Sequence, residues 1–255
     1  MKIQGSVVLV TGGASGIGES ISRYFLEKGA IVYVCDMQED KGKKLESETS
    51  GKIKFIKCDI TNEENVKKMI EEIKSAQKRL DTVINSAGIA WGELIASEKG
   101  VHKSETFEKV MKVNVFGSFL VSKYAVKLMI ENFDAKKECN GNIIFLASVA
   151  AFDGQKGQTA YSASKGALVG MTLPMARDLG KYKIRVNCIA PGVIVTPMSA
   201  SFDTTTVGKS ILAATPLKRF GLSVEIASTA EFIASNDYVT GSVVRVDGGC
   251  RLPFF

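Results

Sequence analysis

Three side chains near the middle of the chain could together carry out acid–base chemistry on a hydroxyl or carbonyl group. Tyr161 and Lys165 are four residues apart, so a helix would place the phenol and the ammonium on one face. A neighbouring cation favours the phenolate form of a tyrosine, whose pKa is ordinarily about 10. Ser148 follows the apolar run Asn142–Leu146 and could hydrogen-bond the oxygen that Tyr161 protonates or deprotonates. The pattern therefore predicts proton transfer at an alcohol or carbonyl.

The spacing alone is not specific, because Tyr24 and Lys28 satisfy the same Y-x-x-x-K pattern. They lie near the end of a different predicted helix, without a strand-end serine before them. We interpret this first pair as a surface or packing feature. The second pair is favoured because it follows the complete pattern of a dinucleotide-binding fold.

A glycine-rich turn near the start of the chain predicts binding of a pyrophosphate. The segment Thr11–Gly18 (TGGASGIG) follows the apolar strand Val7–Val10 and precedes an amphipathic helix. We expect Gly12 to allow the sharp turn, Gly16 to let the backbone approach the pyrophosphate, and Gly18 to let the helix pack against the strand. The helix N-terminus would face the phosphates. The alternative is an ordinary glycine-rich turn.

An acidic residue after the second predicted strand indicates the type of dinucleotide. The strand Ala30–Cys35 ends at Asp36, whose carboxylate can accept hydrogen bonds from both hydroxyls of the adenosine ribose and would repel a 2′-phosphate. Its neighbours Met37 and Gln38 are uncharged, so NAD is preferred over NADP. Lys41 is the nearest cation, and the preference weakens if its side chain folds back towards Asp36.

The remaining pattern alternates strands with helices and predicts one domain over residues 1–255. Further strands are predicted at Ile53–Lys57, Leu80–Asn85, Asn142–Leu146, Ile184–Ile189 and Ser242–Val246. The expected fold is α/β, a single Rossmann-type doubly wound parallel sheet of about seven strands in the order 3-2-1-4-5-6-7, with helices on both faces. The long connections at about 89–104 and 193–219 are expected to bind substrate, the second as a mobile lid.

Composition is that of an ordinary globular enzyme and excludes several other classes of function. The 255 residues are 45% hydrophobic and 24% charged, with a net charge of +6 spread over predicted helices, which argues against nucleic-acid binding. One histidine, His102, cannot supply a metal cluster, so no metal is predicted. The scattered cysteines are expected to be buried free thiols. There is no signal peptide and no run of eighteen apolar residues, so we expect a protein of the cytoplasm or the mitochondrial matrix, outside the membrane.

These motifs, in this order, resemble the short-chain dehydrogenase/reductase family over essentially the full chain. The resemblance rests on the TG-x-x-x-G-x-G turn, Asp59, the N-S-A-G tetrapeptide at Asn85 (with Ser86 for a usual Asn), Asn114, Ser148, Tyr161, Lys165 and Pro191-Gly192. It implies a catalytic tetrad of Asn114, Ser148, Tyr161 and Lys165. The expected cofactor contacts are Gly12, Ser15, Gly16, Ile17, Gly18, Asp36, Asp59, Ile60, Asn85, Ala87, Gly88, Tyr161, Lys165, Pro191, Gly192, Val193 and Thr196.

Asn114 stands alone as a polar residue in an apolar stretch of a predicted helix, and such an amide needs hydrogen-bond partners. It is either a satisfied core amide or a residue that holds a water relaying protons to Lys165. The motifs around it favour the second interpretation.

Longer runs are similar to one subfamily, the type-2 3-hydroxyacyl-CoA dehydrogenases, also called 17β-hydroxysteroid dehydrogenases type 10. They include AGIA at Ala87, ASVAAFDGQKGQTAYSASKG at Ala147, GMTLPMARDL at Gly170, IRVNCIAPG at Ile184 and VVRVDGG at Val243. The resemblance implies an NAD-dependent homotetramer that interconverts 3-hydroxyacyl-CoA and 3-oxoacyl-CoA, with hydroxysteroids as further substrates.

Several alternatives remain open at this point. One is an NAD-linked hydroxysteroid or other secondary-alcohol dehydrogenase. A 3-oxoacyl carrier-protein reductase ranks lower, because Asp36 disfavours NADPH. A non-catalytic dinucleotide-binding scaffold is disfavoured by the intact tetrad. The apolar tail residues Leu252, Phe254 and Phe255 are expected to contact another subunit.

Overall fold

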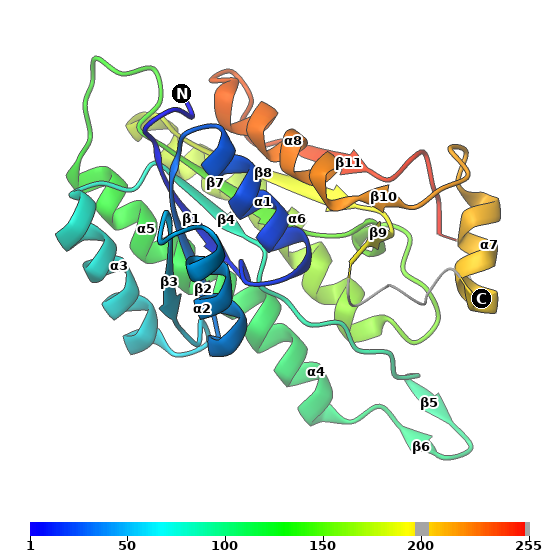
Figure 1. Ribbon diagram of the computed structural model, residues 1–255. Helices are drawn as coiled ribbons and strands as arrows, with labels where there is room; N and C mark the ends of the chain where they lie inside the picture. The colour runs from blue at the N-terminus through cyan, green and yellow to red at the C-terminus, as the bar shows by residue number, and fades with distance from the viewer. Residues whose placement is uncertain (197–203, 253–255) are drawn as a thin grey trace.

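A seven-stranded parallel sheet forms the centre of the protein in a computed structural model, which describes residues 1–196 and 204–252 (Figure 1). The sheet consists of β1 (Val7–Thr11), β2 (Ile31–Asp36), β3 (Ile53–Lys57), β4 (Thr82–Asn85), β7 (Gly141–Leu146), β8 (Ile184–Pro191) and β11 (Val243–Val246). Its order is β3-β2-β1-β4-β7-β8-β11, with every neighbouring pair parallel. The predicted doubly wound fold and strand order are confirmed.

Helices cover both faces of this sheet, as Figure 1 shows. The described residues include the helices α1 (Gly16–Glu27), α2 (Glu39–Glu48), α3 (Glu63–Gln77), α4 (Ser104–Met111), α5 (Ser118–Glu131), α6 (Thr159–Leu179), α7 (Thr206–Ala214) and α8 (Ser223–Ser235), and the short helices η1 (Lys112–Gly117), η2 (Val149–Ala151) and η3 (Gly180–Tyr182). One hydrophobic cluster packs α3, α5 and α6 against the sheet, and a second packs α1, α2 and α8 against its other face. Because both faces are covered, β1 is buried at every position.

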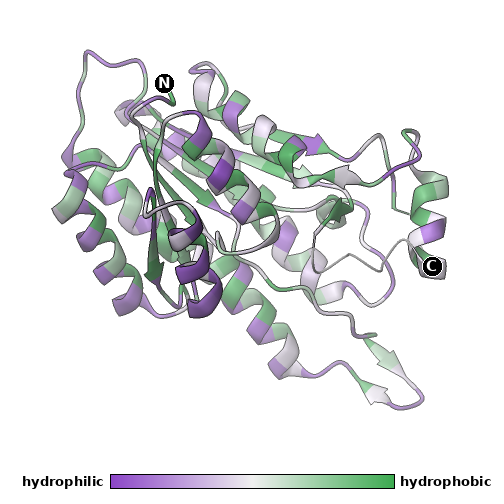
Figure 2. Cartoon of the chain, in the orientation of Figure 1, coloured by the Kyte–Doolittle hydropathy of each residue, from purple (hydrophilic) through white to green (hydrophobic). Residues whose placement is uncertain are grey.

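The hydropathy pattern explains which side of each helix meets the sheet. Apolar colour concentrates in the strands and polar colour on the outer helix surfaces in Figure 2. In α1, for example, Ile21 and Phe25 are four residues apart and fully buried, while Glu19 and Arg23 form a half-buried ion pair on the outer side. The apolar side of this amphipathic helix packs against the sheet, and this packing fixes the position of the glycine turn that precedes the helix.

Strand register aligns the carboxyl ends at a single rim. Thr11 of β1 pairs with Asn85 of β4, and Asn85 in turn pairs with Phe145 of β7. Leu146 pairs with Ile189 of β8, close to the end of that strand. Ligands of open parallel sheets bind outside such carboxyl ends.

Both long connections contain small sheets that the sequence pattern did not predict. The first carries an antiparallel hairpin of β5 (Ala96–Ser97) and β6 (Gly100–Val101), which projects from the body of the protein in Figure 1. The second is closed at its base by the parallel pair β9 (Ile194–Val195) and β10 (Gly221–Leu222). Residues 197–203 of the predicted lid, and Phe254 and Phe255 of the tail, lie outside the described residues.

The segment Ser104–Glu131 is long and apolar enough to cross a membrane by length and composition. More than half of its most apolar part is buried within the protein, as for a core helix. Its middle, η1, is a π-helical turn, a rare geometry that is frequent at functional sites.

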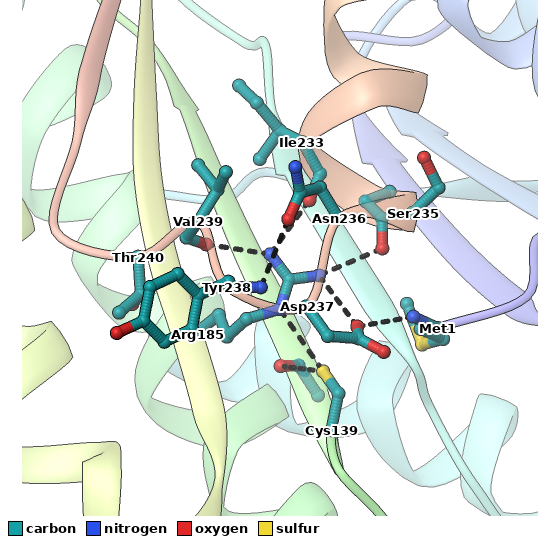
Figure 3. A network of polar contacts seen from close by, with 12 residues as sticks. Met1, Cys139, Arg185, Ile233, Ser235, Asn236, Asp237, Tyr238, Val239 and Thr240 are labelled. Carbon is teal, nitrogen blue, oxygen red and sulfur yellow. Dashed lines mark hydrogen bonds and ion pairs between the residues drawn. The ribbon is translucent and has the colours of Figure 1, made fainter.

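A buried arginine, Arg185, connects the start of β8 to the C-terminal end of α8 (Figure 3). Arg185 is 4% exposed, and its guanidinium donates to the carbonyl oxygens of Ile233, Ala234 and Val239 at 2.7 to 2.9 Å. It also lies 3.7 Å from Asp237. A cation that satisfies the last carbonyls of a helix stabilises its C-terminus, so we assign this network to folding.

Two smaller expectations can be compared with the structure. All five cysteines are free and buried, as expected: Cys35, Cys58, Cys139, Cys188 and Cys250. The sequence pattern Thr61-x-x-Glu64 predicts a capping box that begins α3 at Thr61. This prediction is wrong, because Asn62 caps the helix by accepting from the amide of Asn65 at 3.1 Å. The Thr61 hydroxyl donates instead to Asp59 at 2.8 Å, so Asp59 shapes the turn before α3.

Candidate active site

A cleft of about 660 Å³ opens along the carboxyl rim of the sheet and collects most of the predicted site residues. The predicted cofactor residues that line it are Gly12, Ser15, Gly16, Ile17, Gly18, Asp36, Asp59, Ile60, Ala87, Gly88, Tyr161, Lys165, Pro191 and Thr196. The cleft thus runs from the glycine turn and Asp36 to the predicted acid–base pair.

Three predicted cofactor residues lie elsewhere. Asn85 is buried, and its amide donates to the hydroxyl of Ser122 at 3.0 Å. Gly192 packs against the C-terminal turn, because an added Cβ would lie 2.9 Å from the Cα of Asp247. Val193 lines a separate cavity of about 490 Å³, whose lining also includes Thr215, Leu217 and residues of the C-terminal turn such as Asp247. These three can shape the rim without lining the cleft.

The glycine turn has the geometry of a phosphate cradle. Gly12 has φ +62°, and a Cβ there would lie 2.7 Å from the Cα of Ala87, so only glycine fits. A Cβ on Gly18 would lie 2.3 Å from the carbonyl oxygen of Gly12. Gly18 therefore lets the helix pack against the turn itself, which corrects the expected contact with the strand. Ser15, the N-cap of α1, makes no side-chain capping bond, which leaves the first amides of the helix for an anion.

Asp36 lies at the end of β2 beside this turn. Its Oδ2 accepts from the amide of Ala14 at 3.3 Å and its Oδ1 from the amide of Gln38 at 3.0 Å. Each oxygen keeps a lone pair for a further donor, which suits the two hydroxyls of a ribose. Lys41 lines the same part of the cleft. The turn and Asp36 together fit the pyrophosphate and ribose of a nicotinamide dinucleotide.

The acid–base pair lies at the other end of the cleft, on the first turns of α6. Lys165 is 6% exposed, and its Nζ donates to the carbonyl oxygen of Leu146 at 2.8 Å and lies 5.7 Å from the centre of the Tyr161 ring. Burial lowers the pKa of Lys165 to about 8, against a smaller opposing effect of Cys188. The ammonium remains charged at neutral pH, but it has no carboxylate partner among the described residues.

Two opposing effects act on Tyr161. Burial raises the pKa of its phenol, and a hydrogen bond with the Ser148 hydroxyl lowers it by less. Without a cofactor the phenol is therefore protonated at neutral pH. The Ser148 hydroxyl also accepts from the amide of Ala150 at 3.1 Å, as the cap of η2, which fixes it at the end of β7. The structure thus brings Ser148, Tyr161 and Lys165 together.

Asn114 lies in the π-helical turn η1 and connects this turn to Ile89, after β4, and to Ser164 of α6. Its Oδ1 accepts from the amide of Ile89 at 2.8 Å, and its Nδ2 donates to the Ile89 carbonyl and the Ser164 hydroxyl, both at 2.9 Å. Gly88 separates Asn114 from Lys165, because a Cβ on it would lie 3.2 Å from the Oδ1 and 3.4 Å from the Nζ. Both amide hydrogens are used on protein atoms, so the water relay stays a prediction that could involve only the oxygens of Asn114.

Ser164 is a site residue that sequence reasoning missed. It is fully buried, accepts from Asn114 and donates to the backbone carbonyl of Tyr161 at 2.7 Å. Ser164 therefore connects α6, which carries Tyr161 and Lys165, to η1. A serine beside Lys165 on a helix was the available signal, but only the fold shows that Asn114 lies opposite it.

The comparisons with known proteins can now be set beside this geometry. A family model described as enoyl-(acyl carrier protein) reductase, from the short-chain dehydrogenases, matches residues 12–251. The 3-hydroxyacyl-CoA dehydrogenase type-2 of Drosophila melanogaster is 40% identical, covering 98% of this chain and 99% of that protein. A 3-oxoacyl-(acyl-carrier-protein) reductase of Thermotoga maritima is 35% identical, covering 98% and 99%.

A solved structure of 3-hydroxyacyl-CoA dehydrogenase type-2 from Mycobacterium avium superposes with a TM-score of 0.89 at 31% identity, covering 99% of each chain. Two relatives and one structure thus agree over nearly the whole length of the chain, and their names describe oxidoreductases. The chain belongs to the short-chain dehydrogenase/reductase family of oxidoreductases.

Proposed function

We propose that the protein is an NAD-dependent dehydrogenase that interconverts 3-hydroxyacyl-CoA and 3-oxoacyl-CoA, with Tyr161 as general acid and base. The observation that carries the proposal is the buried Lys165 beside Tyr161, at one end of a cleft whose other end carries Asp36. The substrate class is supported by the relatives named 3-hydroxyacyl-CoA dehydrogenase type-2.

The chemistry follows from the positions of these side chains. A bound nicotinamide would exchange a hydride with the substrate carbon. In the reductive direction, the phenol of Tyr161 donates its proton to the carbonyl oxygen, and Ser148 donates a hydrogen bond to the same oxygen. Lys165 stabilises the phenolate that remains, because its charge lies close to the ring and is not neutralised by a carboxylate. In the oxidative direction the same groups act in reverse.

The choice of NAD rests on Asp36. Its carboxylate can bind two ribose hydroxyls and repels a 2′-phosphate. Lys41 lines the cleft nearby and could partly offset this repulsion. The test compares kcat/KM for NADH and NADPH in the wild type, Asp36→Asn and Lys41→Met. We expect NADH to be preferred in the wild type, the preference to shrink in Asp36→Asn, and Lys41→Met to weaken NADPH further. A preference for NADPH in the wild type would overturn the assignment.

The substrate is tested by following NADH oxidation with acetoacetyl-CoA, beside a 17-ketosteroid and an acetoacetyl carrier protein. Fast turnover of the CoA thioester supports the proposal. Turnover of the steroid alone would indicate the runner-up, a hydroxysteroid dehydrogenase. NADH binding without turnover of any of them would favour a non-catalytic scaffold. The carrier-protein reaction is a real competitor because of the Thermotoga relative, and Asp36 is the observation against it.

We further propose a homotetramer. Three exposed phenylalanines, Phe107, Phe116 and Phe119, lie along the segment from α4 to α5, and a neighbouring subunit would remove them from water. Light scattering on the purified protein tests this proposal, and a monomer at micromolar concentration would contradict it.

A further inference from the structure

One arginine outside the predicted site contacts two different segments of the chain. Arg245 of β11 donates from Nε to Asp247 at 2.7 Å, and from Nη2 to Asp153 at 2.5 Å and to the carbonyl oxygen of Cys250 at 3.1 Å. Its guanidinium also lies 5.2 Å from the centre of the Phe152 ring. Asp153 and Phe152 belong to the loop between Ser148 and α6, whereas Asp247 and Cys250 belong to the C-terminal turn. The guanidinium therefore bridges these two segments.

The first segment leads directly to the catalytic serine. Backbone hydrogen bonds close a compact turn, from the amide of Ala151 to the carbonyl of Ser148 at 3.0 Å, and from the amides of Phe152 and Asp153 to the carbonyl of Val149 at 2.9 Å. A turn held in this way moves as one unit. A displacement of Asp153 is therefore passed on to Ser148, only five residues away.

The following residues of the same loop rest on the helix that carries Tyr161. A Cβ added to Gly154 would lie 2.6 Å from the hydroxyl oxygen of Ser162, which directly follows Tyr161. The contact leaves no room for the loop to move towards α6. Arg245 on one side and α6 on the other thus hold the Ser148 turn between them.

The second segment leads to the rim of the cofactor cleft. Asp247 packs directly against Gly192, where an added Cβ would lie 2.9 Å from the Asp247 Cα. The amide of Gly192 donates to the carbonyl of Val246 at 2.9 Å, and Val246 is the register partner of Pro191, which lines the cleft. The position of Asp247 is therefore fixed relative to the cleft.

We infer that Arg245 is a positioning residue, which sets the Ser148 turn at a fixed place relative to the Pro191–Gly192 rim by binding Asp153 and Asp247 at once. The inference rests on the proposed catalytic role of Ser148. Both carboxylates are largely buried, with 18% and 8% of their side chains exposed, so a cation beside each offsets the cost of burial. Arg251 also contacts Asp247, at 3.3 Å, but among the described residues only Arg245 contacts both carboxylates. Only a planar fork can donate to both in fixed directions, and a lysine ammonium cannot.

The experiment uses Arg245→Lys, Asp153→Asn and the double variant, with Arg79→Lys as matched control. Arg79 is also a forked arginine, which donates to Asp81 and to the carbonyl of Gly5 at the amino end of the sheet. We expect each single variant to lower kcat about 10-fold, because small misplacements of catalytic groups carry such losses. The double variant should be no slower than the slower single variant, and the NADH Kd should stay within about two-fold of the wild type.

Two results separate positioning from a general loss of stability. One is a lower kcat with an unchanged NADH Kd, and the other is that the effects of the two single variants on kcat do not multiply in the double variant. Variants that lower Tm but keep kcat within two-fold, or single effects on kcat that multiply in the double variant, would overturn the inference. A third readout does not depend on substrate. Amide hydrogen exchange of residues 147–158 should accelerate in both single variants and not in Arg79→Lys. Absence of wild-type turnover would contradict the proposed function, and unchanged exchange would contradict the role of Arg245.

Discussion

Two pairs of residues with the same spacing, Tyr24–Lys28 and Tyr161–Lys165, have opposite electrostatic surroundings. The lysine ammonium lies 5.1 Å from the ring centre in the first pair and 5.7 Å in the second. In the first pair, Glu231 of α8 accepts from the phenol at 2.7 Å and pairs with Lys28 at 3.1 Å. The second pair has no carboxylate partner among the described residues. The spacing therefore places a tyrosine beside a lysine in both cases, and the packing of neighbouring elements determines whether a carboxylate neutralises the lysine.

The pKa values show the consequence. Glu231 raises the pKa of both Tyr24 and Lys28, which keeps one neutral and the other charged. Burial lowers the pKa of Lys165 to about 8, because the charged ammonium is less stable away from water. A phenolate that forms on Tyr161 would stabilise this ammonium and be stabilised by it. Glu231 joins the Tyr24–Lys28 pair to α8, which supports the interpretation of this pair as a packing feature.

The largest contrast is expected between the two tyrosines. Tyr161→Phe removes the proposed proton donor and should lower kcat by about 10² to 10⁴-fold, with NADH affinity nearly unchanged. Tyr24→Phe removes a hydroxyl of the same kind at the other pair and should leave kcat within two-fold. Steady-state kinetics with NADH titrations in parallel make this comparison. Equal losses in both variants, or turnover retained in Tyr161→Phe, would contradict it.

The second contrast concerns stability and pH. The pKa of Lys165 is about 8 in the folded protein, below the ordinary 10.5 expected in the unfolded chain. The free energy of unfolding is therefore lowered at any pH at which Lys165 is charged in both the folded and the unfolded state. This penalty, on the order of 3 kcal/mol, is full below pH 8 and disappears as the pH rises towards 10.5. Lys165→Met should therefore gain stability relative to the wild type at pH 7 and lose that advantage near pH 10.

Thermal unfolding of Lys165→Met and of Lys28→Met at several pH values checks this sign. Lys28 is exposed and its pKa is raised, so its replacement should produce no gain at pH 7. A stability difference for Lys165→Met that does not change between pH 7 and pH 10 would show that burial does not perturb Lys165.

A smaller effect is expected on the pH profile of reduction. The proposed mechanism requires a charged Lys165, so kcat/KM should be flat below pH 8 and fall by at most about 10-fold per pH unit above it. Lys165→Arg keeps its charge throughout this range, so whatever activity it retains should not fall there. An identical decline in both proteins would assign the titration to another group.

The sequence predicts the sheet well because its signals are local. Strand and helix periods, the glycine turn and the order of connections all follow from residues within about thirty positions of one another. Asp36 and Tyr161 could be placed for the same reason, since strand ends and helical spacing locate them. The alternation of elements then specifies how these local units assemble.

The features that were missed depend on contacts between distant segments. Asn114 was recognised as a polar residue needing partners, but its partner Ser164 is fifty positions away and only the fold brings them together. The pairing of Arg245 with Asp153 spans ninety-two positions. The short sheets in the two long connections likewise have no periodic signal, because strands of two residues are too short to show one.

The smallest expected effect is at Glu231, the residue that distinguishes the two pairs. Its folded pKa is lowered, mainly by the hydrogen bond from Tyr24, so its contribution to stability is present at neutral pH and is lost as the pH falls through its folded pKa. Because the group is partly exposed, solvent screening limits this contribution to about 1 kcal/mol. Glu231→Gln should therefore lower Tm slightly at pH 7, make no difference in strong acid, and leave kcat unchanged. A loss of turnover in this variant would show that the α1–α8 contact, and with it Tyr24–Lys28, takes part in the reaction after all.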